Sequence, residues 1–276
     1  MSELPKISII TPSFNQGQFI GRTIESVLFQ DYPNLEYIVM DGGSTDDSAE
    51  IIRSYGDRLA YWCSEPDGGQ TDAIVKGMSR ATGDILGYLN SDDVLLPNAL
   101  LAVAESLNTD AEEWAIGQQQ IIDENDNLLA LRPVYPFSLA DLWHNQYLVP
   151  QECTFFTRQL YDRVGGFQAT YKYAMDMHAW LRMCSVCPPK MIPGYVGCFR
   201  VHSEQKSSRM DKYFEEAETA RTDVENWRIA NQMQPHPRKP PLRGPLFRAA
   251  KACFYLRRGG PKMLRDIWNF QRNYRY

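Results

Sequence analysis

The sequence contains no long apolar segment. Hydrophobic residues make up 43% of its 276 residues, but no run approaches the roughly 18 apolar residues that a membrane-spanning helix needs. Residues 1–5 also lack the basic start, apolar segment and cleavage site of a secretory signal. We therefore expect a cytosolic protein that is not integral to a membrane.

Cysteine is scarce and unpatterned. The six cysteines show no framework of paired spacings, so we expect reduced thiols. Cys184 and Cys187 form one C-x-x-C, which lacks the second pair that a zinc site needs and the thioredoxin-like context that a redox motif needs. Two nucleotide motifs are also absent. The glycine-rich stretches match neither the P-loop nor the G-x-G-x-x-G fingerprint, so an ATPase or a dehydrogenase lacks its main support.

Short apolar runs alternate with helical patterns in the first 110 residues. Runs typical of strands occupy residues 6–11, 35–40, 59–63 and 85–89, and helical spacing of apolar residues covers 19–28, 51–52, 71–80 and 98–107. A strand, a helix and a second strand within about thirty residues form the βαβ unit of a parallel sheet. We predict an α/β domain whose mixed, mostly parallel sheet is flanked by helices.

The rest of the chain reads less regularly. We expect a hairpin from residues 114–116 and 128–131, a strand around 149–156, helices at 160–164 and from Asp176, and an edge strand at 191–200. An amphipathic helix follows at 210–229. The predicted organisation is a catalytic domain (1–208), an amphipathic helix packed on it (209–234), and a Pro-rich linker with a basic amphipathic tail (235–276).

Polar loops follow several predicted strands. Residues 13–17, 41–47 and 65–70 combine Asp, Ser or Asn with Gly. Ligands of open α/β sheets bind at the carboxyl ends of the strands, where these loops should meet. The central run 85–89 ends in Asn90-Ser91-Asp92-Asp93. Two adjacent carboxylates repel each other unless a cation or a hydrogen-bond donor offsets their charge. A divalent metal that carries a phosphorylated ligand would explain why both stand here. Alternatively, Asp92 or Asp93 caps the helix that begins near Pro97.

Together these motifs resemble the family 2 glycosyltransferases, inverting enzymes of the GT-A fold that use nucleotide sugars. The resemblance runs from about residue 7 to about residue 208. It is carried, in the expected order, by Ile9-Ile10-Thr11-Pro12-Ser13-Phe14-Asn15, Asp41-Gly42-Gly43-Ser44-Thr45-Asp46, Leu89-Asn90-Ser91-Asp92-Asp93, Gly165-Gly166-Phe167, Met175-Asp176 and His202.

The resemblance implies a role for each of these positions. Asp176 would be the catalytic base, with Gln151, Glu152 and Gly166 on the acceptor side. Asp92, Asp93 and His202 would hold Mn²⁺ or Mg²⁺. The nucleotide sugar would bind Thr11, Pro12, Ser13, Phe14, Asp41, Asp72, Asn90 and Ser91.

Two positions depart from the family pattern. Asn90 replaces the first aspartate of a strict D-x-D, so the metal should rest chiefly on Asp92. His178 stands where many relatives carry a second acid. Two of the implied roles also have simpler alternatives. An acid such as Asp176 in a first helical turn also complements the helix dipole, and a lone histidine such as His202 is often a surface residue.

The implied reaction is a direct displacement at the anomeric carbon, in which Asp176 takes the proton of an acceptor hydroxyl. A UDP-sugar donor is favoured, with a saccharide or lipid-linked saccharide acceptor of bacterial surface polysaccharide or lipopolysaccharide synthesis. Ligation by the His202 imidazole would favour Mn²⁺ over Mg²⁺. Two alternatives are a non-catalytic nucleotide-sugar-binding subunit and a glycoside hydrolase, which needs two acids astride a bond but no nucleotide or metal.

Charge is unevenly distributed. From Arg238 onward the chain holds eleven Lys or Arg and one acid, a net charge of +10. Because the net charge of the whole chain is −5, residues 1–237 carry −15. Residues 246–258 interleave basic with apolar side chains, the pattern of an interfacial helix. We expect peripheral binding to an anionic membrane, with a helical pair packed on the acidic body as the alternative. Nucleic acid is a poor partner because the acidic body would repel it.

Overall fold

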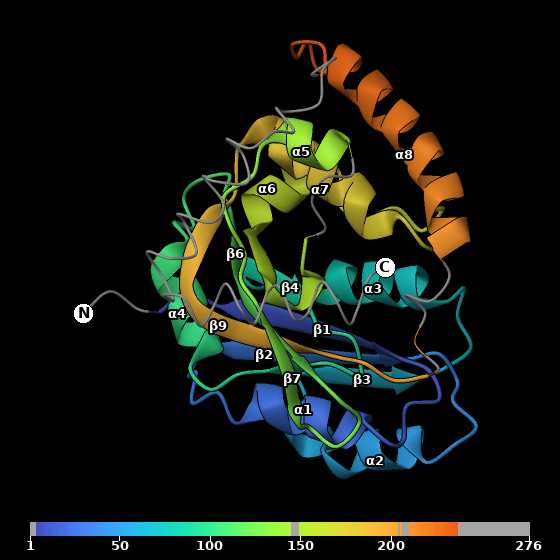
Figure 1. Cartoon of the computed structure of the whole chain (residues 1–276). Coiled ribbons are helices and arrows are strands. Elements are labelled where there is room, and N and C mark those ends of the chain that lie inside the picture. The colour runs from blue at the N-terminus through green and yellow to red at the C-terminus, as the bar shows by residue number, and fades with distance from the viewer. Residues whose placement is uncertain (1–3, 145–148, 204, 206–209, 237–276) are drawn as a thin grey trace.

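The computed structural model describes residues 4–144, 149–203, 205 and 210–236, which form an α/β fold around one nine-stranded sheet (Figure 1). Its strands are β1 (Ile7–Ser13), β2 (Leu35–Asp41), β3 (Tyr61–Ser64), β4 (Ile85–Tyr88), β5 (Val94–Leu95), β6 (Trp114–Ile122), β7 (Leu128–Arg132), β8 (Thr154–Thr157) and β9 (Lys190–Arg200). Its helices are α1 (Ile20–Leu28), α2 (Ser48–Ser54), α3 (Gln70–Arg80), α4 (Ala99–Ser106), α5 (Leu139–Trp143), α6 (Arg158–Val164), α7 (Met175–Val186) and α8 (Met210–Ala230), with 3₁₀ turns η1 (Gly56–Arg58) and η2 (Gln151–Cys153).

The first half of the sheet is parallel, as predicted. The strand order is β3-β2-β1-β4-β8-β6-β9-β5, with β7 paired to β6, and β3, β2, β1 and β4 run in the same direction. All seven residues of β1 are buried, which is typical of a parallel strand covered on both faces. Figure 1 shows α1 and α2 below these strands and α3 above them. The second half is mixed, because β8 is antiparallel to both β4 and β6.

Two predictions about the second half were wrong. The strand at 191–200 is not at the edge: β9 pairs in parallel with β6 on one side and antiparallel with the short strand β5 on the other. The segment 149–156 is a strand only in its last part, because the η2 turn precedes β8. The first error arises from a pairing between segments far apart in the sequence, which local patterns do not report, and the second from a local 3₁₀ turn within an apolar run.

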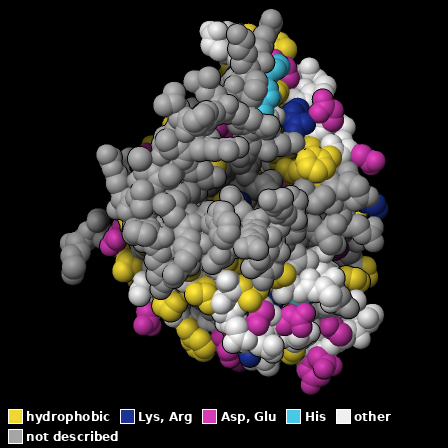
Figure 2. Space-filling model, viewed as in Figure 1, with side chains coloured by type: hydrophobic (Ala, Val, Ile, Leu, Met, Phe, Trp, Pro, Cys, Tyr) yellow, Lys and Arg dark blue, Asp and Glu magenta, His cyan; other side chains and the backbone are white. Residues whose placement is uncertain are grey.

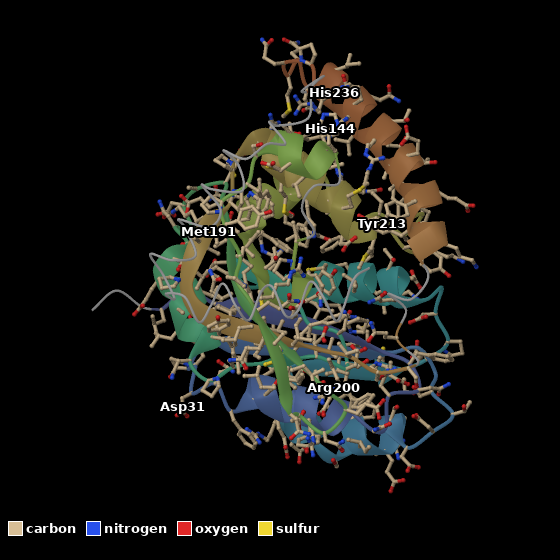
Figure 3. The ribbon with its side chains drawn as sticks, viewed as in Figure 1. Asp31, His144, Met191, Arg200, Tyr213 and His236 are labelled. Carbon is tan, nitrogen blue, oxygen red and sulfur yellow. The ribbon has the colours of Figure 1, made fainter. Side chains whose placement is uncertain are left out.

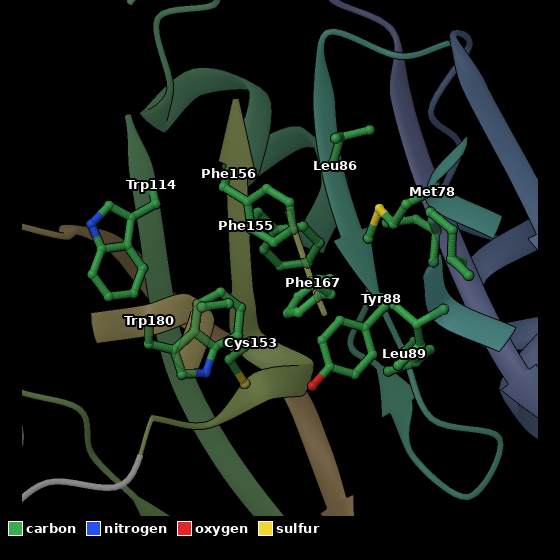
Figure 4. Close-up of a cluster of buried hydrophobic side chains, with 14 of the residues drawn as sticks. Met78, Leu86, Tyr88, Leu89, Trp114, Cys153, Phe155, Phe156, Phe167 and Trp180 are labelled. Atoms are coloured by element: carbon green, nitrogen blue, oxygen red, sulfur yellow. The ribbon is translucent and has the colours of Figure 1, made fainter. Parts of the chain in front are cut away.

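Aromatic side chains fill the core between the two halves (Figure 4). The rings of Trp114 on β6 and Trp180 on α7 stack with centroids 5.8 Å apart, and Phe156 of β8 and Phe167 pack against Trp180. Offset and edge-to-face pairs add roughly 0.5–1.5 kcal/mol each to the burial energy. This aromatic cluster fixes α7 against the sheet, and with it the position of the first helical turn of α7.

Helix α8 lies along α7 on the outside of the fold (Figure 1). Ala217, Ala220 and Val224 form its buried stripe, and small side chains at these positions allow close approach. Among the described helices, none combines the length and the apolarity needed to cross a membrane. The basic tail and most of the Pro-rich linker, residues 237–276, lie outside the described residues. In Figure 2, acidic side chains gather on the lower part of the visible face, over α1 and α2.

Candidate active site

Register brings the ends of the parallel strands to one level. Ser13 at the end of β1 pairs with Asp41 at the end of β2, and Asp41 pairs with Ser64 at the end of β3. The amide of Leu89 donates to the carbonyl of Ile10, so β4 ends three residues earlier in register, and the segment after Tyr88 leads toward the same edge. The polar loops predicted from the sequence therefore meet at one edge of the sheet.

The Asp41 carboxylate organises the first part of this edge. The side chain is 1% exposed and accepts hydrogen bonds from the Ser44 amide (2.9 Å), the Ser44 hydroxyl (2.5 Å) and the Ser64 hydroxyl (2.7 Å). These bonds shape the glycine loop after β2 and tie it to β3.

The loops after β1 and β2 are joined to each other. Asn15, at a positive φ of 52°, donates its amide to Ser44 Oγ and accepts the Thr45 amide on its side chain, and the Gly17 amide donates to Asp46 Oδ2. Phe14, the first residue after β1, is 59% exposed. An exposed aromatic ring at the ligand edge of a sheet offers a surface on which a planar base can stack.

Asp72 closes the next loop. Its carboxylate pairs with Lys76 at 2.7 Å and accepts the Gly68 amide at 2.9 Å, and these two interactions lower the pKa of Asp72. The neighbouring side chain of Gln70 donates to Asn90 Oδ1 at 2.7 Å, which links the start of α3 to the segment after β4.

The two consecutive aspartates after β4 have different environments. Asp92 Oδ2 lies 3.0 Å from His202 Nε2, although 110 residues separate them. The His202 ring also packs on Phe19 with centroids 4.9 Å apart. The Asp92 side chain keeps 21% of its surface exposed. A carboxylate and an imidazole, the two donor types predicted for the metal site, are therefore adjacent, and of the two only the carboxylate is partly exposed, because the His202 side chain is 5% exposed.

Asp93 points into the protein. It is 1% exposed, its Oδ1 accepts the Arg200 amide at 2.9 Å, and its Oδ2 lies 3.2 Å from Gln151 Nε2. Burial raises the pKa of the Asp93 carboxyl well above its ordinary value, and the charges of Asp92 and Glu152 raise it further. Asp93 therefore anchors the end of β9 to this edge. Neither aspartate caps the next helix, because α4 has Asn98 at its N-cap without a side-chain hydrogen bond.

Arg200 is a site residue that sequence reasoning missed. It is fully buried, donates Nε to the Asp92 carbonyl at 2.7 Å, and pairs through Nη1 with Asp126 at 2.6 Å (Figure 3). Arg200 thereby fixes the backbone at Asp92, in the Asp92-Asp93 pair. The one signal in the sequence was its position, a lone arginine at the end of an apolar strand, two residues before His202.

The predicted acceptor side lies across the end of β4. Gln151 contacts Asp93, and Glu152, 2% exposed, accepts a hydrogen bond from Gln119 of β6. Burial raises the pKa of Glu152, which favours its neutral form. Gly166 adopts φ 62°, and a Cβ there would come within 2.7 Å of the Tyr161 ring. Glycine is therefore required at this position by the backbone and by packing.

Asp176 stands in the first turn of α7 and is partly exposed. Its Oδ1 accepts the Met177 amide at 2.6 Å. Burial raises the pKa values of Tyr88 and Tyr213, and in both cases the charge of Asp176 adds to the increase. Because Tyr88 is the last residue of β4, Asp176 faces the end of the strand that leads to Asp92.

His178 serves the structure of α7. It is 4% exposed, and its Nδ1 lies 3.2 Å from Arg182 Nη2. Because a guanidinium only donates, Nδ1 must accept, and the ring is neutral. Arg182 also donates to the carbonyls of Val164 and Gly166, so the pair fixes the glycine loop to α7.

The donor set fits a divalent cation that takes further ligands from its substrate. Asp92 Oδ2 and His202 Nε2, which a 3.0 Å hydrogen bond joins in this structure, are donor types that Mn²⁺ accepts, and a cation would take the place of the proton between them. The described residues include no group of three or more Asp, Glu, His or Cys placed to hold a metal. Oxygen atoms of a bound diphosphate and of water would have to complete the coordination.

Comparison with known proteins agrees with this geometry. Residues 8–175 match the model of glycosyl transferase family 2. An uncharacterized glycosyltransferase of Mycobacterium tuberculosis is 35% identical over 197 residues, which cover 70% of this chain and 74% of the relative. A similar fold occurs in TarS of S. aureus, solved with UDP-GlcNAc (TM-score 0.64, 17% identity, 79% of this chain and 66% of that one).

A second solved structure of similar fold is the mannosyltransferase PcManGT of Pyrobaculum calidifontis, in complex with GDP-Man and Mn²⁺. It has a TM-score of 0.55 and 18% identity, and the match covers 92% of this chain and 81% of that one. The family model covers more than half of the chain, and both solved neighbours are transferases of the GT-A fold. The chain therefore belongs to glycosyl transferase family 2 and is a glycosyltransferase with the GT-A fold.

Proposed function

We propose that the protein is an inverting glycosyltransferase that moves a sugar from a nucleotide-diphosphate sugar to a hydroxyl group of a saccharide or lipid-linked saccharide. The observation that carries the proposal is the pairing of Asp92 with His202 at the ligand edge of the sheet, together with an acid, Asp176, in the first turn of α7 near the Tyr88 end of β4. A UDP-sugar is the favoured donor, and bacterial surface polysaccharide or lipopolysaccharide synthesis is the favoured setting. UDP-GlcNAc in TarS and GDP-Man in PcManGT show that proteins of this fold bind such donors.

On the donor side, the nucleotide would lie over the loops after β1 and β2. Phe14 offers a stacking surface, and Thr11, Pro12 and Ser13 border the loop that Asp41 holds in shape. Asp72, Asn90 and Ser91 would line the path from the nucleoside to the diphosphate. Asp92 and His202 would hold Mn²⁺ or Mg²⁺. Asp93 would support this pair through its hydrogen bond to the backbone amide of Arg200, two residues before His202. When bound, the cation would offset the negative charge that develops on the leaving diphosphate.

On the acceptor side, Asp176 would remove the proton of the attacking hydroxyl. The hydroxyl oxygen then bonds to the anomeric carbon from the face opposite the diphosphate, and the bond between that carbon and the diphosphate oxygen breaks. The nucleoside diphosphate leaves, and the configuration inverts. A positioned general base contributes typically 10²–10⁴-fold. Gln151, Glu152 and Gly166 would shape the wall against which the acceptor rests.

Calorimetric binding of UDP, GDP, dTDP and CDP, each with and without Mn²⁺, tests the donor site. We expect one nucleotide to bind in a metal-dependent way, with at least tenfold weaker binding by Asp92→Ala. Asp57→Ala removes an exposed carboxylate of η1 and serves as the matched control, expected to bind like the wild type. If no nucleotide binds in any condition, the proposal fails and a glycoside hydrolase becomes the better alternative. Nucleotide binding without any sugar transfer would instead indicate a non-catalytic binding subunit.

We further propose that the enzyme works at the inner face of a membrane, attached by its basic tail. The support is in the sequence, where residues 246–258 combine Arg and Lys with Leu, Phe and Ala. Each basic residue near an anionic surface contributes about 1 kcal/mol. A lipid-linked acceptor would be reached from that position.

A further inference from the structure

One carboxylate of α8 binds the segment that leads into α7. Glu216 accepts hydrogen bonds from three successive backbone amides, those of Lys172 (3.0 Å), Tyr173 (2.6 Å) and Ala174 (2.9 Å). Helix α7 begins at the next residue, Met175. The contact therefore joins α8 to the start of the helix that carries Asp176, across more than forty residues of sequence.

This contact supplies what the start of α7 lacks. Its N-cap residue, Ala174, has no side chain able to cap. The first turn of a helix leaves amides without partners, and its positive end favours an anion. Glu216 brings both an acceptor and a negative charge from a different helix.

A second contact of α8 reaches the same segment. The Tyr171 hydroxyl donates to Asp223, while the Tyr171 carbonyl accepts the Thr71 hydroxyl of α3 at 2.7 Å. Residues 171–174 are thus held between α8 and the first turn of α3. The Tyr213 side chain of α8 also lies on the side of the helix that faces α7 (Figure 3).

We propose that Glu216 is a positioning residue for Asp176, and that α8 is part of the catalytic unit. The inference rests on the proposed function, in which Asp176 is the general base. By fixing the amides of residues 172–174, Glu216 sets where α7 begins and therefore where the Asp176 carboxylate points. Catalysis is sensitive to such placement, because a misplacement of about 1 Å can cost about 10²-fold in rate.

The test compares Glu216→Ala with Glu218→Ala in the full chain. Glu218 is a matched control, because its side chain is 81% exposed on the same helix and pairs with Arg221. Sugar transfer is measured with the sugar donors that carry the nucleotide identified by calorimetry. We expect Glu216→Ala to lower kcat at least tenfold while the KM for the donor and the Kd for the nucleotide stay unchanged. Glu218→Ala should match the wild type in all three.

Amide hydrogen exchange provides a readout that does not depend on activity. Exchange at residues 172–174 should become faster in Glu216→Ala but not in Glu218→Ala, while the amides of β1 and β4 keep their protection. Faster exchange throughout the domain would mean general destabilisation and would overturn a specific positioning role. Unchanged exchange at 172–174 would overturn it as well.

A double-mutant cycle with Asp176→Asn separates this inference from the proposed function. If Glu216 acts through Asp176, adding Glu216→Ala to Asp176→Asn should lower the remaining rate no further. A further tenfold loss would show that Glu216 acts elsewhere. If Glu216→Ala keeps the wild-type rate while Asp176→Asn is slow, only this inference fails. If Asp176→Asn itself keeps the wild-type rate, the proposed role of Asp176 fails.

Discussion

At the scale of single residues, the buried Arg182 guanidinium keeps its neighbour His178 in the neutral form. Arg182 is 4% exposed and gives its donors to the carbonyls of Val164 and Gly166 and to His178. A protonated His178 would face this guanidinium without water to screen it. Burial, followed by the charge of Arg182, lowers the pKa of His178 to about 3.

The lowered pKa of His178 predicts a dependence of stability on pH. An unfolded histidine takes up a proton near pH 6.5, whereas His178 in the folded chain does so only near pH 3. The stability that goes with a neutral His178 is therefore fully present above pH 6.5. As the pH falls from 6.5 toward 3, the unfolded chain binds a proton that the folded chain does not, and the free energy of unfolding has decreased by about 2 kcal/mol at pH 5. His178→Asn keeps a side-chain acceptor but removes the titration. Urea unfolding at pH 7 and pH 5 should show a smaller loss of stability in the variant, and equal losses would contradict the prediction.

Some residues of the candidate site could be found from the sequence and others could not. The sequence predicts Asp92, His202 and Asp176 as site residues because they stand in motifs that resemble those of a known family. It does not predict Arg200 and Glu216, because their partners are mainly backbone atoms that the fold brings to them. No local pattern marks a carboxylate that will accept hydrogen bonds from three amides of a segment more than forty residues away in the sequence.

At the scale of elements, the parallel half was predictable for a physical reason. Its strands β1, β2 and β4 are almost entirely buried, so each is an apolar run bounded by polar loops, whereas the outermost strand β3 is half-buried. The second half depends on pairings that such runs do not specify. The two-residue strand β5 is too short to produce a pattern, and its pairing is what removes β9 from the edge of the sheet.

The contact between α3 and β1 gives a prediction at this scale. A Cβ at Gly77 of α3 would lie 2.5 Å from Cγ2 of Ile10 in β1. Alanine improves helix propensity by about 1 kcal/mol, but overpacking of a core typically costs about 1–3 kcal/mol. We expect Gly77→Ala to lower the free energy of unfolding by about 1 kcal/mol in urea titrations. Ser79→Ala, at an exposed position of the same helix, should change it by less than about 0.5 kcal/mol. A Gly77→Ala protein more stable than the wild type would show that α3 is not held so closely.

At the scale of the whole molecule, the separation of charge suggests an orientation. Residues 1–237 carry −15 and the tail carries +10. Acidic side chains gather over α1 and α2 at one end of the body (Figure 2). An anionic bilayer would repel that end and attract the tail, so attachment would leave α1 and α2 away from the membrane.

Flotation with liposomes tests this attachment. The full chain should float with vesicles that contain phosphatidylglycerol and stay behind with pure phosphatidylcholine, and 0.5 M salt should release it because the attraction is screened. Arg257→Gln combined with Arg258→Gln removes two charges from the tail and should weaken binding by about 2 kcal/mol, or roughly 30-fold. Arg53→Gln, an exposed position of α2, should bind like the wild type because it lies at the acidic end. If removal of residues 237–276 leaves flotation unchanged but lowers the melting temperature, the tail stabilises the acidic body and does not bind the membrane.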